Sequence, residues 1–264
     1  TGAGVFIGNQ GTGVVTVSGS GSLTSNGAGD ALGGIGLGRN DAGAGTGTLN
    51  LNGGTVTTNA DIRTTGGTSI FNFNGGTLKA AVSSTTFMQG LTVANVRNGG
   101  ANIDTNGFNV TIAQPLLHSN IGGDNAIDGG LTKLGVGTLT LSGATTNYTG
   151  VTTVSAGTLT LQDTTVFASS SIVDNANVVL NFSSPFNYAN PITGTGGLTK
   201  TGTSNVTFSG TVVERRVAEG QFVRSGDVLF VIALEGNTLD AEAQAKVRSS
   251  LEERRRSLAD AVRR

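Results

Sequence analysis

The residues best suited to chemistry gather in and just before one short segment, residues 122–130. His118, the only histidine of the chain, precedes it, and Asp124 and Asp128 lie within it. A zinc site would have to combine this histidine with carboxylates, because the chain has no cysteine. Glycine–aspartate turns are typical of calcium sites, but their nonapeptide spacing does not recur here. We therefore predict a loop histidine and solvated turn carboxylates, and no metal site.

Other aspartates are far apart in the sequence, and their side chains could approach one another only if the chain forms successive stacked coils. Asp41 and Asp61 lie twenty residues apart, with Arg39 and Arg63 close by in the sequence. Carbohydrate-cleaving enzymes need such clustered carboxylates. Separate, solvated carboxylates are the favoured interpretation for this pair and for the remaining candidates, Asp30 and Asp104. Glycines separated by one residue are common in this chain, but none directly precedes the Lys-Ser/Thr pair of a phosphate-binding loop. The sequence thus predicts no catalytic and no cofactor-binding residue.

Short strand patterns separated by glycine must position any such residues. Gly-Thr-Leu-Thr-Leu occurs at residues 137–141 and again at residues 157–161. Side chains alternate across a strand, so the leucines share one face and the threonines the other. A repeat of about 20 to 25 residues is the size of one coil of a parallel β-helix, and about nine coils fit into residues 1–210. We expect an inward row of Leu139, Leu141, Leu159 and Leu161 and an outward row of Thr138, Thr140, Thr158 and Thr160.

The stretch from Thr85 to Asn125 is less repetitive. Residues 87–91 and 103–112 still alternate, and Asn106-Gly107 is typical of a tight turn. Gln114-Pro115 should interrupt a strand, since proline cannot donate a ladder hydrogen bond. We interpret this stretch as further coils with longer excursions.

Composition divides the chain near Gly210. Residues 1–210 hold six Lys and Arg, eight Asp and no Glu, whereas residues 211–264 hold ten Lys and Arg and nine Asp and Glu. A thirteen-residue phrase at residues 131–143 is answered at residues 198–210, but the second copy then continues differently. We expect two unrelated segments joined at this point, and therefore a fusion.

The first segment resembles a known family. Residues 130–143, followed by Asn147-Tyr-Thr-Gly150 and Thr153–Leu159, resemble the passenger-associated repeat of type V autotransporters. The resemblance implies a right-handed parallel β-helix displayed on or released from the Gram-negative cell surface. It also implies an N-terminal signal and a C-terminal membrane barrel. Neither is visible in this sequence, so we expect a passenger fragment.

The second segment resembles another family. The phrase from Val217 to Ile232 is similar to the first lipoyl-like half-motif of periplasmic adaptor (membrane fusion) proteins of type I secretion and efflux. Residues 211–236 would form this half-motif. Residues 237–264, with Asn237 as a candidate N-cap, would form a truncated amphipathic hairpin helix. The partner half-motif and the returning helix are absent from the sequence, so the adaptor role is not expected.

The sequence therefore predicts an all-β chain: a right-handed parallel β-helix over residues 1–210, a short β segment and one C-terminal α-helix. The expected function is that of a non-enzymatic, extracellular or cell-surface protein without cofactor. The alternatives are a carbohydrate-active β-helix enzyme and a secretion or efflux adaptor component. Near-neutral net charge gives no case for nucleic acid, and no apolar run reaches the roughly 18 residues of a membrane span. The candidate partners are a host surface, a glycan and further copies through the solenoid ends.

Overall fold

The computed structural model describes residues 4–27, 33–39, 45–143, 145–208, 210–215 and 230–234. Contacts divide the chain into two units. One consists of Thr1–Phe186 with Ile192–Val206, and the other of Asn187–Pro191 with Thr207–Arg264. Within the described ranges every regular element is a strand, and no helix there is long and apolar enough to cross a membrane.

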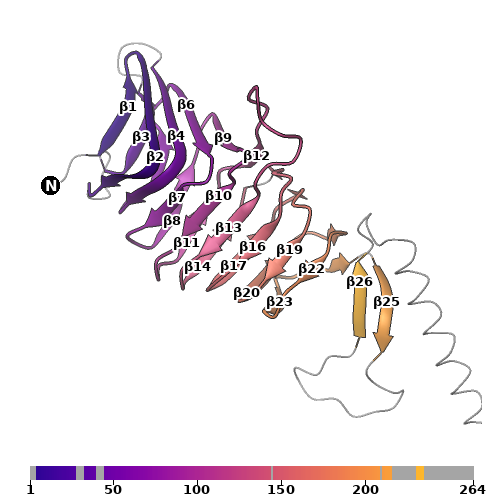
Figure 1. Cartoon of the computed structure of the whole chain (residues 1–264). Helices are drawn as coiled ribbons and strands as arrows, with labels where there is room; N and C mark the ends of the chain where they lie inside the picture. The colour runs from indigo at the N-terminus through magenta and orange to yellow at the C-terminus, as the bar shows by residue number, and fades with distance from the viewer. Residues whose placement is uncertain are drawn as a thin grey trace, which may run out of the picture. The chain divides into compact units, whose positions relative to one another are not determined.

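Nine parallel strands stack into one sheet, called sheet A, that runs through the first unit (Figure 1). Each strand comes from a successive coil of the chain, so neighbours in the sheet are never neighbours in the sequence. This confirms the predicted parallel β-helix. In order, the strands are β1 (Val5–Asn9), β3 (Ile35–Arg39), β5 (Ile62–Thr64), β8 (Ser84–Gln89), β11 (Val110–Ile112), β14 (Thr138–Leu141), β17 (Thr158–Gln162), β20 (Asn177–Asn181) and β23 (Gly197–Thr201).

A second sheet, sheet B, forks. Its first two strands are long, β2 (Thr12–Ser25) and β4 (Thr46–Thr58). The first half of β4 pairs with β6 (Thr68–Phe73) and the second half with β7 (Thr77–Ala80). Gly53 and Gly54 lie between the halves with φ of 103° and 66°, a left-handed conformation that glycine adopts without strain. One branch continues through β9 (Val93–Val96) and β12 (Leu116–His118), and the other through β10 (Ala101–Asp104), β13 (Leu131–Leu134), β16 (Thr152–Val154), β19 (Ile172–Asp174) and β22 (Ile192–Thr193).

Beyond the fork, the later coils have a third face in addition to sheets A and B. After sheet A, each of these coils forms a short strand before it enters sheet B. These short strands pair in twos, β15 (Thr145–Thr146) with β18 (Val166–Phe167), and β21 (Phe186–Tyr188) with β24 (Val206–Phe208).

Aliphatic rows fill the interior as the alternation predicts. Leu139 pairs with Leu159 and Leu141 with Leu161 in adjacent coils, and none of the four side chains is more than 1% exposed. The threonines between them are only partly exposed, on the outer face. Each fully buried leucine stabilises the fold by about 1.5–3 kcal/mol.

The early coils differ from the sequence expectation in length and regularity. Ile62 pairs with Ile35, so one coil takes 27 residues there, whereas Val178 pairs with Leu159 after 19. The long β4 strand accounts for part of the extra length. In β8 the alternation fails, because the pairing register with β11 shifts between Ser84 and Met88. Phe87 and Met88 are consequently both buried.

Bare glycine backbones let the two sheets approach each other near the N-terminus. A Cβ on Gly47 in β4 would lie 2.2 Å from the Ile7 carbonyl oxygen and 2.5 Å from the Gly38 nitrogen. Both are backbone atoms, which cannot rotate away. A Cβ on Gly11, by contrast, would meet nothing within 4 Å.

Gly47→Ala is therefore expected to lower the free energy of unfolding by about 2–3 kcal/mol, the usual cost of overpacking. Gly11→Ala should leave it unchanged or raise it slightly, because alanine restricts the unfolded chain. Urea denaturation followed by circular dichroism compares the two variants. Equal midpoints would show that the sheets do not approach at Gly47.

The second unit contains one antiparallel strand pair, β25 (Gly210–Arg215) with β26 (Phe230–Leu234). A short β segment was predicted over residues 211–236, and this pair lies within it except for Gly210. Residues 216–229 and the predicted helix over residues 237–264 lie outside the described residues.

Candidate functional site

The predicted histidine and one of its neighbouring aspartates form a tight polar cluster. Asp128 is 6% exposed and lies at the end of the excursion between β12 and β13. Its Oδ2 accepts hydrogen bonds from the Thr149 amide at 2.7 Å and the Thr149 hydroxyl at 3.1 Å, and lies 2.9 Å from His118 Nδ1. Its Oδ1 accepts from the amides of Gly130 and Gly150, each at 2.9 Å. The carboxylate thus ties the excursion to the following coil.

These contacts indicate a structural role for the Asp128 carboxylate. Burial alone would raise the pKa of Asp128, but the hydrogen bonds from Thr149, His118, Gly150 and Gly130 outweigh it and lower the pKa. Both Asp128 and the Thr149 hydroxyl lie near the same imidazole nitrogen, Nδ1, at 2.9 and 3.3 Å. A proton relay needs its two partners on opposite ring nitrogens. Thr149 and His118 are therefore not arranged as the nucleophile and base of a triad.

Asp128→Asn should make the protein less stable at neutral pH by about 1–3 kcal/mol, because the amide cannot accept all of these hydrogen bonds. The native carboxyl has a lowered pKa, so its stabilisation is present above the unfolded value near 4 and is lost as the pH falls through the folded value. Urea melts between pH 7 and pH 3 measure this. The difference between the native protein and the variant should shrink as the pH falls; a constant difference would contradict it.

The other aspartate of the excursion binds an arginine. Asp124 receives two hydrogen bonds from Arg97, Nε to Oδ2 at 2.8 Å and Nη2 to Oδ1 at 3.0 Å. The bonds from Arg97 lower the pKa of Asp124. Both oxygens of the carboxylate thus accept hydrogen bonds from a cation. Asp124 and Asp128 therefore bind protein donors, each on a different partner.

The remaining acidic candidates do not converge in the described part of the chain. Asp61 lies 3.3 Å from Arg63, two residues on in β5, and Asp104 lies 3.4 Å from Lys79 of the preceding coil. The 27-residue coil here means that residues twenty apart are not in register. Asp30 and Asp41 lie outside the described residues. Among the described side chains, no three of His, Cys, Asp or Glu gather to hold a metal ion.

Sequence reasoning missed a buried ammonium group in the interior. Lys133 lies in β13 at an inward position and is 0% exposed. Its Nζ donates to the Thr105 hydroxyl at 2.9 Å and to the carbonyls of Leu134, Gly135 and Ala156 at 2.9, 2.7 and 3.0 Å. Burial lowers the pKa of Lys133 to about 8. The sequence did contain a signal for this position. Side chains alternate along the strand, so a buried Leu131 implies that Lys133, two residues on, is buried as well.

The second copy of the repeated phrase retains this local contact in another place. Lys200 Nζ donates to the carbonyls of Thr201 and Gly202, which correspond to Leu134 and Gly135 of the first copy. However, Lys200 lies in β23 of sheet A, whereas Lys133 lies in sheet B. Lys200 is also exposed. The lysine–turn contact is thus a local unit that forms on either sheet.

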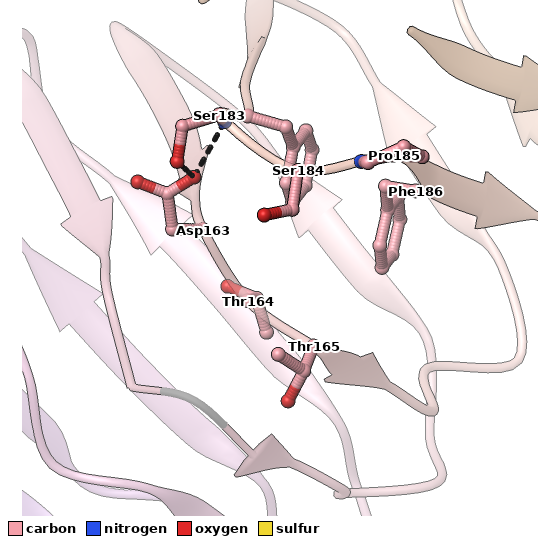
Figure 2. A pocket seen from close by; sticks show the side chains of 8 residues that line it. Asp163, Thr164, Thr165, Ser183, Ser184, Pro185 and Phe186 are labelled. Carbon is pink, nitrogen blue, oxygen red and sulfur yellow. Dashed lines mark hydrogen bonds between the residues drawn. The ribbon is translucent and has the colours of Figure 1, made fainter. Parts of the chain in front are cut away.

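A small hollow between two neighbouring corner turns was also missed. It encloses about 170 Å3 and is lined by residues 163–165 and 182–186. Asp163, with φ of 48°, accepts hydrogen bonds at Oδ1 from the Ser183 amide at 2.6 Å and the Ser183 hydroxyl at 2.7 Å (Figure 2). The Ser183 amide bond is the main cause of a lowered Asp163 pKa. The side chain is therefore a carboxylate at neutral pH.

One segment of the β-helix is similar to a known repeat family. Residues 131–161 match the model of the passenger-associated-transport-repeat family. No curated protein and no solved structure matches the chain. The matched segment runs from β13 to β17 and contains Lys133 and the paired leucine rows.

The repeat and the parallel β-helix together fit a segment of an autotransporter passenger. The repeat family implies a secreted or cell-surface location.

Proposed function

We propose that the chain serves as a non-enzymatic structural segment of an autotransporter passenger, which holds a rigid β-helix at the bacterial surface and presents it for adhesion. The observation that carries this proposal is the position of the matched repeat. It lies over consecutive coils, whose strands β14 and β17 are the sixth and seventh of the nine in sheet A, so the repeat is part of the solenoid itself.

The distribution of polar groups supports a structural role. Asp124, Asp128 and Lys133 all bind groups of the protein itself. Each coil hydrogen-bonds mainly to its two neighbours, as in other solenoids, so folding can proceed coil by coil from any folded start. Coils that emerge from a pore would then template one another, and folding outside the cell would need no energy source.

The adaptor-like tail is the second part of the proposal. Residues 211–264 would derive from a secretion adaptor and would not perform the adaptor role alone. This rests on the sequence resemblance of residues 217–232. The alternative of a carbohydrate-active enzyme requires acidic residues that converge on a bound sugar chain.

A display experiment tests the proposal. The chain is placed between an export signal and an autotransporter membrane barrel, and external protease reports whether it reaches the surface folded. We expect a protease-resistant product on intact cells, and a sensitive one for Leu159→Asp, which breaks an interior row. Adhesion to immobilised glycans or host cells should rise over cells that display the barrel alone. A native chain that is degraded or stays inside, or reducing sugar released from polysaccharides by the purified chain, would contradict the proposal.

A further inference from the structure

The hollow beside Asp163 holds polar atoms that the fold does not use. Asp163 Oδ1 is occupied by Ser183. Within the described part of the chain, Asp163 Oδ2 and the Ser184 hydroxyl have no hydrogen-bond partner. Asp163 and Ser184 are both exposed. They come from adjacent coils, so the fold, and not a single loop, brings them to one hollow.

An apolar surface completes the hollow. Phe182 and Phe186 stack with centroids 4.4 Å apart and planes at 5°. Both rings are buried, with 2% and 8% of their surface exposed, so the hollow has a fixed wall. Exposed Pro185 lies next to Phe186. Figure 2 shows the Asp163–Ser183 hydrogen bonds on one side of the hollow and Phe186 on the other.

From this arrangement we infer that the hollow binds one neutral sugar unit. The volume of about 170 Å3 is below the roughly 300–1,000 Å3 of pockets for drug-sized ligands, so one small ring is the largest suitable group. A pyranose offers hydroxyl donors to the carboxylate, a hydroxyl partner for Ser184 and a C–H face for exposed Pro185, which the buried phenylalanines support from behind. An anion is excluded by the charge of Asp163.

The inference deepens the adhesive part of the proposed function and rests on it for the source of the sugar, a surface glycan. The binding itself does not require display on a cell. Failure to bind sugars by a chain that is displayed and folded would therefore overturn this inference alone.

Saturation-transfer NMR on the full purified chain tests the site. The probes are the methyl glycosides of glucose, galactose, mannose and N-acetylglucosamine, each titrated to 50 mM. We expect at least one to bind with a Kd of about 1–10 mM, the range for a ligand of this size. Ser184→Trp, which fills the hollow, should weaken that binding at least tenfold. Asp163→Asn, which keeps an acceptor for Ser183 but removes the charge, should weaken it several-fold.

The matched control is Ser170→Trp, which adds the same ring at an exposed serine outside the hollow. It should bind as the native chain does. Circular dichroism melts confirm that all three variants are folded. Absence of binding by every glycoside, binding that Ser184→Trp leaves unchanged, or binding of methylammonium in place of any sugar would overturn the inference.

Discussion

Replacing Leu139 with aspartate is expected to unfold the central coils. Leu139 is 0% exposed and lies between Val110 and Leu159 of the adjacent coils. The variant loses the burial of one leucine and places an unpaired carboxyl among aliphatic side chains. Together these cost about 4 kcal/mol or more, a large part of the stability of an ordinary domain.

The neighbouring residue provides the control. Thr140 pairs with Thr111 and Thr160 on the outer face and is partly exposed, so Thr140→Asp should change stability by less than about 1 kcal/mol. Thermal melts followed by circular dichroism of the full chain compare both variants with the native protein. If the two variants melt alike, the inward and outward assignment of this strand is wrong.

The second large effect is expected from Lys133→Met. The methionine would fill much of the space of the lysine stem but remove the donor that the carbonyls of Leu134, Gly135 and Ala156 share. The Leu134 carbonyl would still accept from the Thr105 amide at 3.1 Å. The Ala156 and Gly135 carbonyls therefore lose most. Each buried acceptor left unpaired costs about 1–3 kcal/mol. Removal of a buried charge offsets part of this cost. We expect a net loss of about 2–4 kcal/mol, measured by urea denaturation.

Lys200→Met is the matched control, because it removes the same local contact from an exposed site, and it should change stability by at most about 0.5 kcal/mol. A pH series adds a second readout. Because the folded pKa of Lys133 is about 8 and the unfolded value 10.5, the unfolded chain holds more protons between these values. Stability should therefore rise between pH 8 and pH 10.5 by up to about 3 kcal/mol. Lys133→Met should lack this rise; a variant that retains it would show that another group titrates.

Local pattern was sufficient to predict the solenoid and its inward rows. The leucines at 139, 141, 159 and 161 form their rows because a strand alternates strictly and the coils are in register. The turn at Asn106-Gly107 was also predicted from the sequence, and both residues adopt positive φ. These features depend on residues that are close in the sequence or separated by one fixed period.

The missed features depend on register between coils of unequal length. The fork of sheet B, the register shift in β8 and the hollow beside Asp163 arise from pairings 19 to 27 residues apart that no constant period describes. Lys133 was missed for a different reason. Lysine is seldom fully buried, and only its neighbours, three carbonyls and a hydroxyl from different turns, make the interior position tolerable.

The lysine–turn contact forms in sheet B at Lys133 and in sheet A at Lys200. This has a consequence for how the gene can change in length. The repeated phrase recurs after 67 residues, whereas the three coils that follow β13 in sheet B, through β16 and β19 to β22, take 61. The duplicate therefore occupies a different side of the tube from its original. Insertions and deletions need not comprise whole windings, because a segment out of phase still finds partners on the next side. Recombination could lengthen or shorten this protein in small, irregular steps without loss of its architecture.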